Sequence, residues 1–113
     1  MKNLIVLLLV FMSLPVMAQQ AIYTDNDGDG VIEYTLLNNN GKVEETGFYL
    51  NGKMTGTWTS YYPNGKKKMV AKFRDGVKHG TWLVYDTQNR VVTEVVYNND
   101  KKVSASQHNY ASN

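Results

Sequence analysis

The sequence has 113 residues, a formal net charge of +2 and no cysteine. This length allows one small domain, and the lack of cysteine excludes disulfide cross-links and a lipid anchor on a cysteine after the N-terminal apolar run. Eight tyrosines, three phenylalanines, two tryptophans and nine glycines supply strand-forming and turn-forming residues. We therefore expect stability to come from strand pairing and aromatic packing.

Charge is distributed unevenly along the chain. Residues 19–51 hold six acids and one base, a net charge of −5, whereas residues 52–103 hold ten bases and four acids, a net charge of +6. Opposite charges on the two halves favour the steering of a charged partner or head-to-tail association. The alternative is a metal loop at one end and solvated lysines at the other.

Residues 1–18 have the three-part layout of a secretory signal peptide. A basic start at Lys2 precedes an apolar run from Leu4 to Met12, and Val16 and Ala18 fit the −3 and −1 positions of a cleavage site. The alternative is an uncleaved anchor helix, but the run is shorter than the about 20 residues that span a bilayer. We expect cleavage near Ala18, a periplasmic or extracellular location, and no transmembrane segment in the mature chain.

The acidic segment that follows, residues 25–33, has the pattern of a calcium-binding loop. Aspartates at its first, third and fifth positions precede a glycine at the sixth, and such oxygen ligands suit Ca²⁺. Leu36 stands where an EF-hand has a bidentate glutamate, so the loop resembles those of dockerins or thrombospondins more closely. The expected ligands are Asp25, Asp27, Asp29, the carbonyl of Val31, and Glu33. The alternative is a plain hairpin turn at Asp27-Gly28, and we expect no other cofactor.

A 24-residue repeat runs through the rest of the chain. The matching pairs include Gly52 with Gly76, Gly56 with Gly80, Trp58 with Trp82, Tyr61 with Tyr85, and Tyr34 with Trp58. Three copies result, at residues 28–51, 52–75 and 76–99, and the first and last are degenerate. Degenerate end copies are typical of stacked repeats, because terminal copies meet solvent.

Each copy has the pattern of a β-hairpin. In the middle copy, Thr57 to Tyr62 and Lys67 to Phe73 are the expected strands, and Asn64-Gly65 between them suits a turn. The second strand alternates, which predicts one face with Lys67, Met69, Ala71 and Phe73. Matching turns at Asn51-Gly52 and Asp75-Gly76 link successive copies. The fold class predicted is all-β, an antiparallel meander that forms one elongated, twisted sheet. Residues 19–27 form an N-terminal segment, and residues 104–113 are small, polar and unpatterned, which predicts a flexible tail.

Whole motifs in residues 28–103 resemble a known repeat family. The runs Asn51 to Trp58, Tyr61 to Lys66, and Asp75 to Trp82 are similar to a variant of the MORN repeat. The resemblance implies β-hairpins side by side in an elongated sheet, with protein partners and, in some members, phospholipid ligands. Related bacterial proteins carry the label of antitoxin components of toxin–antitoxin systems, which implies a neutralised toxin as partner.

Two sets of residues are candidates for partner binding. The aromatic set offers a stacking surface, and the alternative is that repeat-equivalent aromatic residues only pack. The basic set forms a stripe, joined by Arg74 and Lys78, that suits acidic lipid or glycan, and the alternative is solvated lysines that protect strand edges. The candidates are Trp58, Tyr61, Trp82 and Tyr85, together with Lys66, Lys67, Lys68 and Lys72.

Catalytic motifs are missing from the sequence. His79 lies in a repeat turn and His108 in the expected tail, and there is no cysteine nucleophile, phosphate-binding glycine loop or zinc-type histidine spacing. We therefore expect a non-enzymatic exported module for protein–protein interaction or envelope scaffolding, with no nucleic-acid ligand. The alternatives are an antitoxin-like or immunity-like protein and a binder of acidic lipid or glycan.

Overall fold

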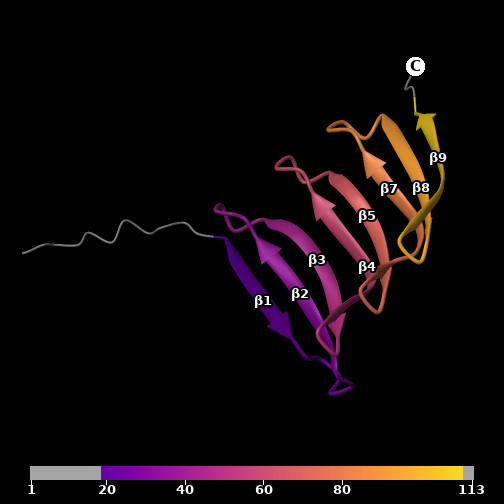
Figure 1. The fold of residues 1–113 in the computed structure, drawn as a ribbon. Helices are drawn as coiled ribbons and strands as arrows, with labels where there is room; N and C mark the ends of the chain where they lie inside the picture. Colours follow the sequence, from indigo (N-terminus) through magenta and orange to yellow (C-terminus); the bar gives the residue numbers. More distant parts are fainter. Residues whose placement is uncertain (1–18, 111–113) are drawn as a thin grey trace, which may run out of the picture.

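The computed structural model describes residues 19–110, which form one open sheet of antiparallel strands (Figure 1). The expected signal peptide, residues 1–18, lies outside the described residues. The strands are β1 (Gln20–Thr24), β2 (Val31–Leu37), β3 (Val43–Leu50), β4 (Lys53–Tyr61), β5 (Lys67–Arg74), β6 (Val77–Lys78), β7 (Gly80–Tyr85), β8 (Val91–Asn98) and β9 (Lys101–Asn109). The prediction of an all-β antiparallel meander is confirmed.

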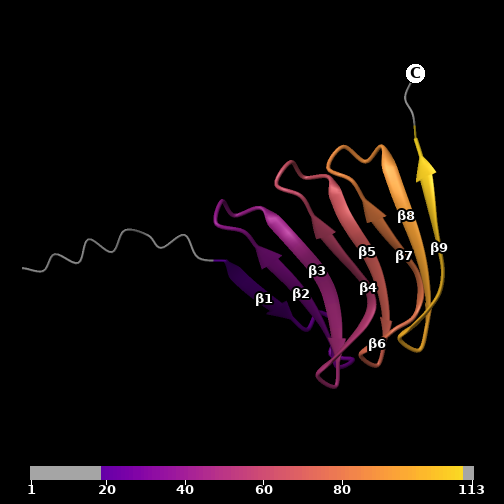
Figure 2. The ribbon, with the colours of Figure 1, turned by 45° about the horizontal axis from the view of Figure 1, so that its top comes forward.

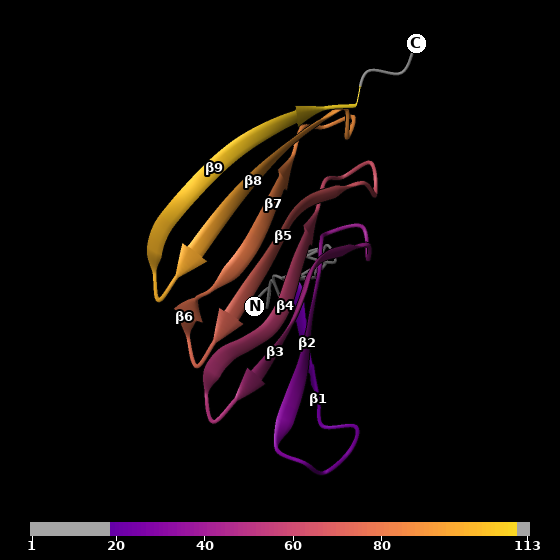
Figure 3. The ribbon, with the colours of Figure 1, turned by 90° about the vertical axis from the view of Figure 1, so that its right-hand side faces the viewer.

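The order of the strands across the sheet follows the order of the chain. It runs β1-β2-β3-β4-β5-β7-β8-β9, and the two-residue β6 pairs with β5 just before the chain enters β7. Figures 2 and 3 show that the sheet is twisted and does not close, so that β1 and β9 form its two edges.

Two kinds of turn alternate at the two ends of the sheet. At one end, two-residue turns begin with Asn51, Asp75 and Asn99, which recur at the spacing of the repeat and have φ of 51°, 50° and 48°. Positive φ of this kind suits the primed turns of tight hairpins, where asparagine, aspartate and glycine are favoured. At the other end, longer turns close with backbone bonds from Asn38 N to Lys42 O and from Tyr62 N to Lys66 O. The predicted turns are therefore present at their expected places.

The predicted strand boundaries differ from the observed ones near Gly56. That glycine has φ of 68° and Gly80 has φ of 77°, and both lie where the register with the preceding strand shifts. The extra residues form a bulge, which glycine allows because it has no Cβ. β4 therefore starts at Lys53 and passes through the bulge, whereas the sequence predicted a start at Thr57.

The main buried cluster of the sheet lies on one face, and one further buried residue, Val92, lies on the other. Trp58, Ala71 and Trp82 form the main cluster, and half-buried apolar side chains surround them, including Met69 and Phe73. The prediction that Met69, Ala71 and Phe73 share a face is confirmed. We call the side of the main cluster the aromatic face, because it carries Tyr23, Tyr34, Tyr49, Trp58, Phe73, Trp82 and Tyr97.

The prediction of a flexible tail over 104–113 is wrong for residues 104–109. These residues belong to β9, which pairs with β8 from Asn98↔Lys101 to Val91↔Asn109. Similarly, residues 20–24 of the expected N-terminal segment form β1, which pairs with β2. All residues of both strands are exposed. Backbone pairing with a neighbouring strand holds an edge strand in place without an apolar pattern.

Candidate functional site

A continuous row of aromatic rings crosses the aromatic face from β1 to β8. Along the row, ring centroids lie 5.3 Å apart for Tyr23–Tyr34, 5.3 Å for Tyr34–Trp58, 6.3 Å for Trp58–Phe73, 5.1 Å for Phe73–Trp82 and 4.9 Å for Trp82–Tyr97. Tyr49 joins the row with its ring 5.1 Å from Trp58 in an edge-on arrangement. Tilted and edge-on contacts at these separations are favourable, so neighbouring rings support one another across the sheet.

The two tryptophans form the base of this row. Trp58 is 4% exposed and Trp82 is 8% exposed. Trp58 Nε1 donates to Phe48 O at 3.1 Å, and the equivalent bond in the next copy runs from Trp82 Nε1 to Lys72 O at 3.0 Å. Burial and a satisfied indole N–H indicate packing, the alternative weighed for these residues, and leave the half-buried rings beside them as the accessible part of the row.

Gly47 explains why Trp58 lies flat on the sheet. A Cβ built on Gly47 would overlap atoms of the indole ring, so the ring occupies the space that any other side chain would need. On the other side of Trp58, the paired residue is Ala71, which is also small. Small residues on both neighbouring strands therefore form the seat for the indole ring.

Lys78 adds a positive charge to the aromatic face. Its Nζ lies 5.2 Å from the ring centroid of Trp82 and 5.2 Å from that of Tyr97, within the range of cation–π attraction. The sequence placed Lys78 in the basic stripe, and its position over two rings was missed. Its spacing of four residues from Trp82 is the only signal for this contact, and only the bulge at Gly80 brings the two together.

The lysines of the expected stripe are divided between a turn and two faces. Lys66 Nζ donates to Gln88 O at 3.4 Å in the neighbouring turn, and Lys68 Nζ lies 5.9 Å from the ring of Tyr62. Lys68 and Lys72 alternate with Met69 and Ala71 along β5, which places them on the face opposite the aromatic one. Among the described residues, these lysines therefore do not form one surface with Lys78.

A hollow of about 810 Å³ lies between two neighbouring turns at one end of the sheet. We call it the turn hollow. Its lining combines amides, aromatic rings and two charged groups, from Gln19, Asn38, Asn39, Asn40, Val43, Glu44, Tyr61, Tyr62, Pro63 and Lys68. Two expected partner-binding residues, Tyr61 and Lys68, meet here. Tyr85 does not line the hollow, but its carbonyl accepts a bond of 2.6 Å from the Oη of Tyr62, which does.

The acidic segment forms the connection between β1 and β2. Asp25 Oδ1 accepts a bond of 2.9 Å from Gly28 N, and Asp29 Oδ1 accepts one of 2.9 Å from Val31 N. Asn26 Nδ2 donates to Glu33 Oε2 at 2.7 Å. These carboxylates thus fix the shape of the loop itself. Within residues 19–110, no three acidic or histidine side chains gather as a metal site would require.

The loop is also longer than the turns with which it aligns in sequence. β1 ends at Thr24 and β2 begins at Val31, whereas β3 and β4 are separated by only Asn51-Gly52. Asp27, aligned with Asn51, is not among the residues with positive φ. The loop therefore connects two strands, as the alternative of a hairpin turn predicted. It is not a two-residue turn of the kind found at Asn51-Gly52. Calcium binding stays a hypothesis.

One carboxylate lies on the aromatic face. Glu45 pairs with Leu36 on one side and Ser60 on the other. Burial raises the pKa of the Glu45 carboxyl, and the neighbouring charge of Glu44 raises it further. Burial likewise raises the pKa of Tyr34, with the charge of Glu45 as the next cause. The ionised form of Glu45 is therefore less favourable in the folded protein than in the unfolded chain.

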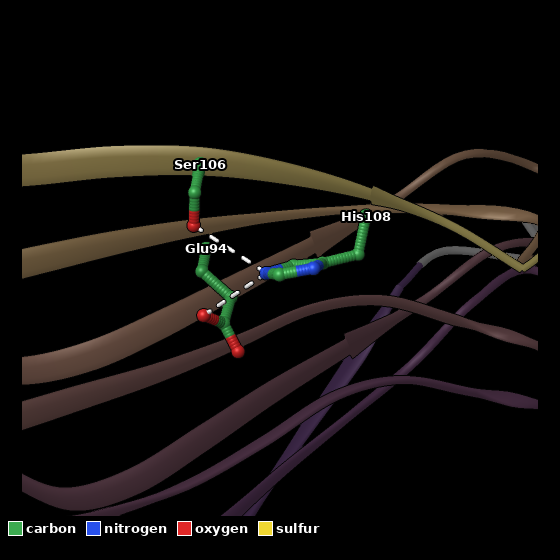
Figure 4. A network of polar contacts seen from close by, with 3 residues as sticks. All are labelled: Glu94, Ser106 and His108. Atoms are coloured by element: carbon green, nitrogen blue, oxygen red, sulfur yellow. Dashed lines mark hydrogen bonds and ion pairs between the residues drawn. The ribbon is translucent and has the colours of Figure 1, made fainter.

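Near β9, Glu94, Ser106 and His108 form a small polar network, shown in Figure 4. Ser106 Oγ and Glu94 Oε2 both lie 3.4 Å from the same nitrogen, Nε2 of His108. A catalytic triad uses the two ring nitrogens separately, one for the nucleophile and one for the acid, so this network lacks that geometry. The sequence analysis missed it because it placed His108 in a tail. The alternation of Ser104, Ser106 and His108 is the signal that marks a strand here.

Comparisons with known proteins add no family. No family model matches the chain, and no curated protein matches it. The MORN-repeat resemblance therefore stays a hypothesis, as does the number of repeat copies. Over residues 19–110, no helix is long and apolar enough to cross a membrane.

Proposed function

We propose that this chain is an exported, non-enzymatic module that binds a protein partner along its aromatic face. The observation that carries the proposal is the row of rings from Tyr23 to Tyr97 on a one-layer sheet. Within residues 19–110, every strand belongs to that sheet, and none packs over the face. Aromatic residues held rigid before binding lose little conformational entropy and are enriched among the residues that dominate interface energies.

The accessible part of this face consists of half-buried rings around the buried tryptophans. Tyr49, Phe73 and Tyr97 follow each other at the spacing of the repeat and pack against the core cluster. Lys78 lies between the last two aromatic residues of the row and adds a cation. A surface with aromatic anchors and a fixed cation suits an elongated protein segment that presents apolar and acidic side chains.

Two matched variants test which face binds. Val84 is 39% exposed and pairs with Met69 on the aromatic face, whereas Phe48 is 37% exposed on the opposite face. We expect Val84→Glu to reduce capture of the partner from the native cell envelope about tenfold, a loss of about 1.4 kcal/mol, while Phe48→Glu preserves capture. Both proteins should keep their β-sheet circular dichroism. Loss of capture only for Phe48→Glu would assign the partner to the opposite face and overturn the proposal.

The exported location is part of this proposal and rests on residues 1–18. N-terminal sequencing of the protein isolated from its native host should give a start near Gln19. Intact Met1 on most molecules would contradict export.

An acidic glycan in the turn hollow is a second candidate ligand. Tyr61 and Tyr62 offer rings for stacking on sugars, the asparagines of the 38–40 turn offer amide bonds, and Lys68 offers a cation. Lys68→Ala should weaken binding of an acidic oligosaccharide, whereas Lys72→Ala, on the same face outside the hollow, should not. Binding of both variants to anionic vesicles with equal loss would instead support a lipid ligand attracted by charge.

The antitoxin-like alternative differs in what the partner does. If the protein captured through the aromatic face is a toxin, adding the mature chain should inhibit its activity at a ratio set by the complex. A captured partner whose activity is unchanged supports scaffolding.

A further inference from the structure

The two edge strands are complementary halves of one repeat unit. β1 pairs with β2 through Ile22↔Thr35, and at the equivalent positions of the next copy β3 pairs with β4 through Thr46↔Thr59. β1 therefore corresponds to β3, the second strand of a hairpin, and residues 19–110 hold no first strand for it.

β9 is the opposite half. Its pairs Asn98↔Lys101 and Tyr97↔Lys102 with β8 repeat, two copies further along the chain, the pairs Leu50↔Lys53 and Tyr49↔Met54 between β3 and β4. β9 therefore corresponds to β4, the first strand of a hairpin. The second strand of that hairpin is missing from the described chain.

We propose that the protein assembles head to tail, with β9 of one molecule pairing with β1 of the next. Each such contact completes the missing hairpin and extends the sheet in the same antiparallel order. The contact is heterologous, because two different edges meet, so it leads to an open chain of molecules or to a closed ring. This inference does not depend on the partner proposed for the aromatic face.

The free edges carry the hydrogen-bonding groups that this pairing needs. Tyr110 N donates to Arg90 O at 2.6 Å, one step beyond the paired residues Val91 and Asn109. Because such bonds alternate along an antiparallel pair, the amide of Ala105 points away from β8, toward the free edge. All residues of β1 and β9 are exposed.

Side chains at the two edges match in size. Ala105 pairs with Val95, which pairs with Trp82, so Ala105 lies on the aromatic face. The bulge in β9 shifts the register by one residue and the bulge in β4 by two, so Ala105 takes the place of Trp58 in its strand. The pairing of Trp58 with Ala71 then predicts that Ala105 lies opposite Tyr23 of the next molecule. A small residue of β9 thus faces a large ring of β1. In the centre of the sheet the arrangement is the reverse, with the large ring of Trp58 in β4 and the small Ala71 in β5. Tyr23 is 60% exposed and Val103 is 63% exposed, so both gain burial in the contact.

Charge selects this pairing over the alternatives. β9 begins with Lys101 and Lys102, and β1 runs into the acidic loop with Asp25, Asp27 and Asp29. The hydrogen bonds Gly76 N to Met54 O and Asp100 N to Lys78 O show that the turn of one copy lies beside the start of the first strand of the preceding copy. If the same 24-residue offset continues into the next molecule, its acidic loop lies beside Lys102. A parallel pair of two β9 edges or of two β1 edges would bring like charges together, and an antiparallel pair of either kind would place no lysine beside the acidic loop.

Sedimentation of the mature chain, residues 19–113, tests the assembly. We expect the weight-average mass to rise with protein concentration above that of the monomer and to fall in 1 M salt, where the charge contacts are screened. A monomer at every concentration up to the millimolar range would overturn the proposal.

The variant Ala105→Pro removes one outward amide without removing a bond to β8. It should stay monomeric, with unchanged circular dichroism, while Ala105→Thr, which keeps the amide, should assemble like the parent. Assembly of the proline variant equal to that of the parent would move the contact away from this edge and reject the proposal.

Charge reversal gives a test that does not depend on proline. Lys101→Glu with Lys102→Glu in one chain, and Asp27→Lys in another, should each weaken self-association. A mixture of the two chains should form dimers, because the unchanged Lys101 and Lys102 of the second chain then meet the unchanged acidic loop of the first. Failure of the mixture to assemble, when both chains are folded, would contradict head-to-tail pairing.

Discussion

The central strands β4–β8 and the edge strands β1 and β9 continue the same antiparallel pairing but differ in the side chains that they carry. In the centre, a tryptophan lies on a glycine or alanine of the neighbouring strand, and its indole N–H reaches a carbonyl beside a glycine bulge. At the edges, Tyr23 is largely exposed, and β9 has serine and alanine where the centre has tryptophan. The turns and the backbone pairing of the repeat thus extend to both edges of the sheet. The large buried side chains lie only in its central strands, and we expect these strands to contribute most to the stability.

The largest expected effect is the loss of a central tryptophan. Trp58→Ala should reduce the free energy of unfolding by about 3–5 kcal/mol, because a buried aromatic side chain leaves a cavity between β3 and β5. Trp82→Ala should cost a similar amount, and Tyr23→Ala at the edge far less. Urea denaturation measures all three. Tryptophan variants that unfold like the parent but lose partner binding would reverse the packing role given to these residues.

A smaller loss of unfolding free energy should follow from a side chain placed at Gly47, beneath the ring of Trp58. Gly47→Ala places a methyl group where the indole ring lies, so the ring must move, at a cost of about 1–3 kcal/mol. In a chain that already carries Trp58→Ala, the same glycine substitution should cost much less. Equal costs in both backgrounds would show that the ring does not rest on Gly47.

Glu45→Gln should stabilise the protein, in a way that depends on pH. The folded-state pKa of Glu45 is raised by burial, so the ionised form carries a penalty that appears as pH rises above the unfolded pKa and is complete above the folded pKa. We therefore expect a melting temperature a few degrees higher than the parent at pH 7 and no difference in acid, below both pKa values. Glu44→Gln should give a smaller gain of the same sign, because the charge of Glu44 is the lesser cause of the raised pKa of Glu45. An equal gain for Glu45→Gln at both pH values would contradict the role of ionisation.

The smallest expected effect is that of calcium on the acidic loop. If the loop binds Ca²⁺ as its pattern predicts, the melting temperature should be higher in millimolar Ca²⁺ than in chelator at matched ionic strength, Mg²⁺ should not reproduce the rise, and Asp27→Asn with Asp29→Asn should abolish it. A melting temperature that Ca²⁺ does not change would leave the loop as a plain connection between β1 and β2.

The sequence predicted the central part of the fold well because each local feature there has a physical cause that is visible in the residues. Asn-Gly and Asp-Gly mark the tight turns, and Trp58 and Trp82 mark the core, whereas the bulge at Gly56 was not predicted. β1 and β9 were missed because an edge strand takes its stability from backbone bonds to a neighbour, which leave little trace in side-chain pattern. The turn hollow was missed for a related reason, since its walls come from the turns of two successive copies, which are far apart in sequence.

Strand order that follows chain order has a consequence for how the protein folds. Each described strand pairs with strands that are next to it in sequence, so closing each pair fixes only a short loop. Topologies of such low contact order fold fast, and a stack of similar units can start at any copy and extend outward. Each hairpin can therefore form as soon as its two strands are free, whichever end of the chain becomes available first, without waiting for a distant segment.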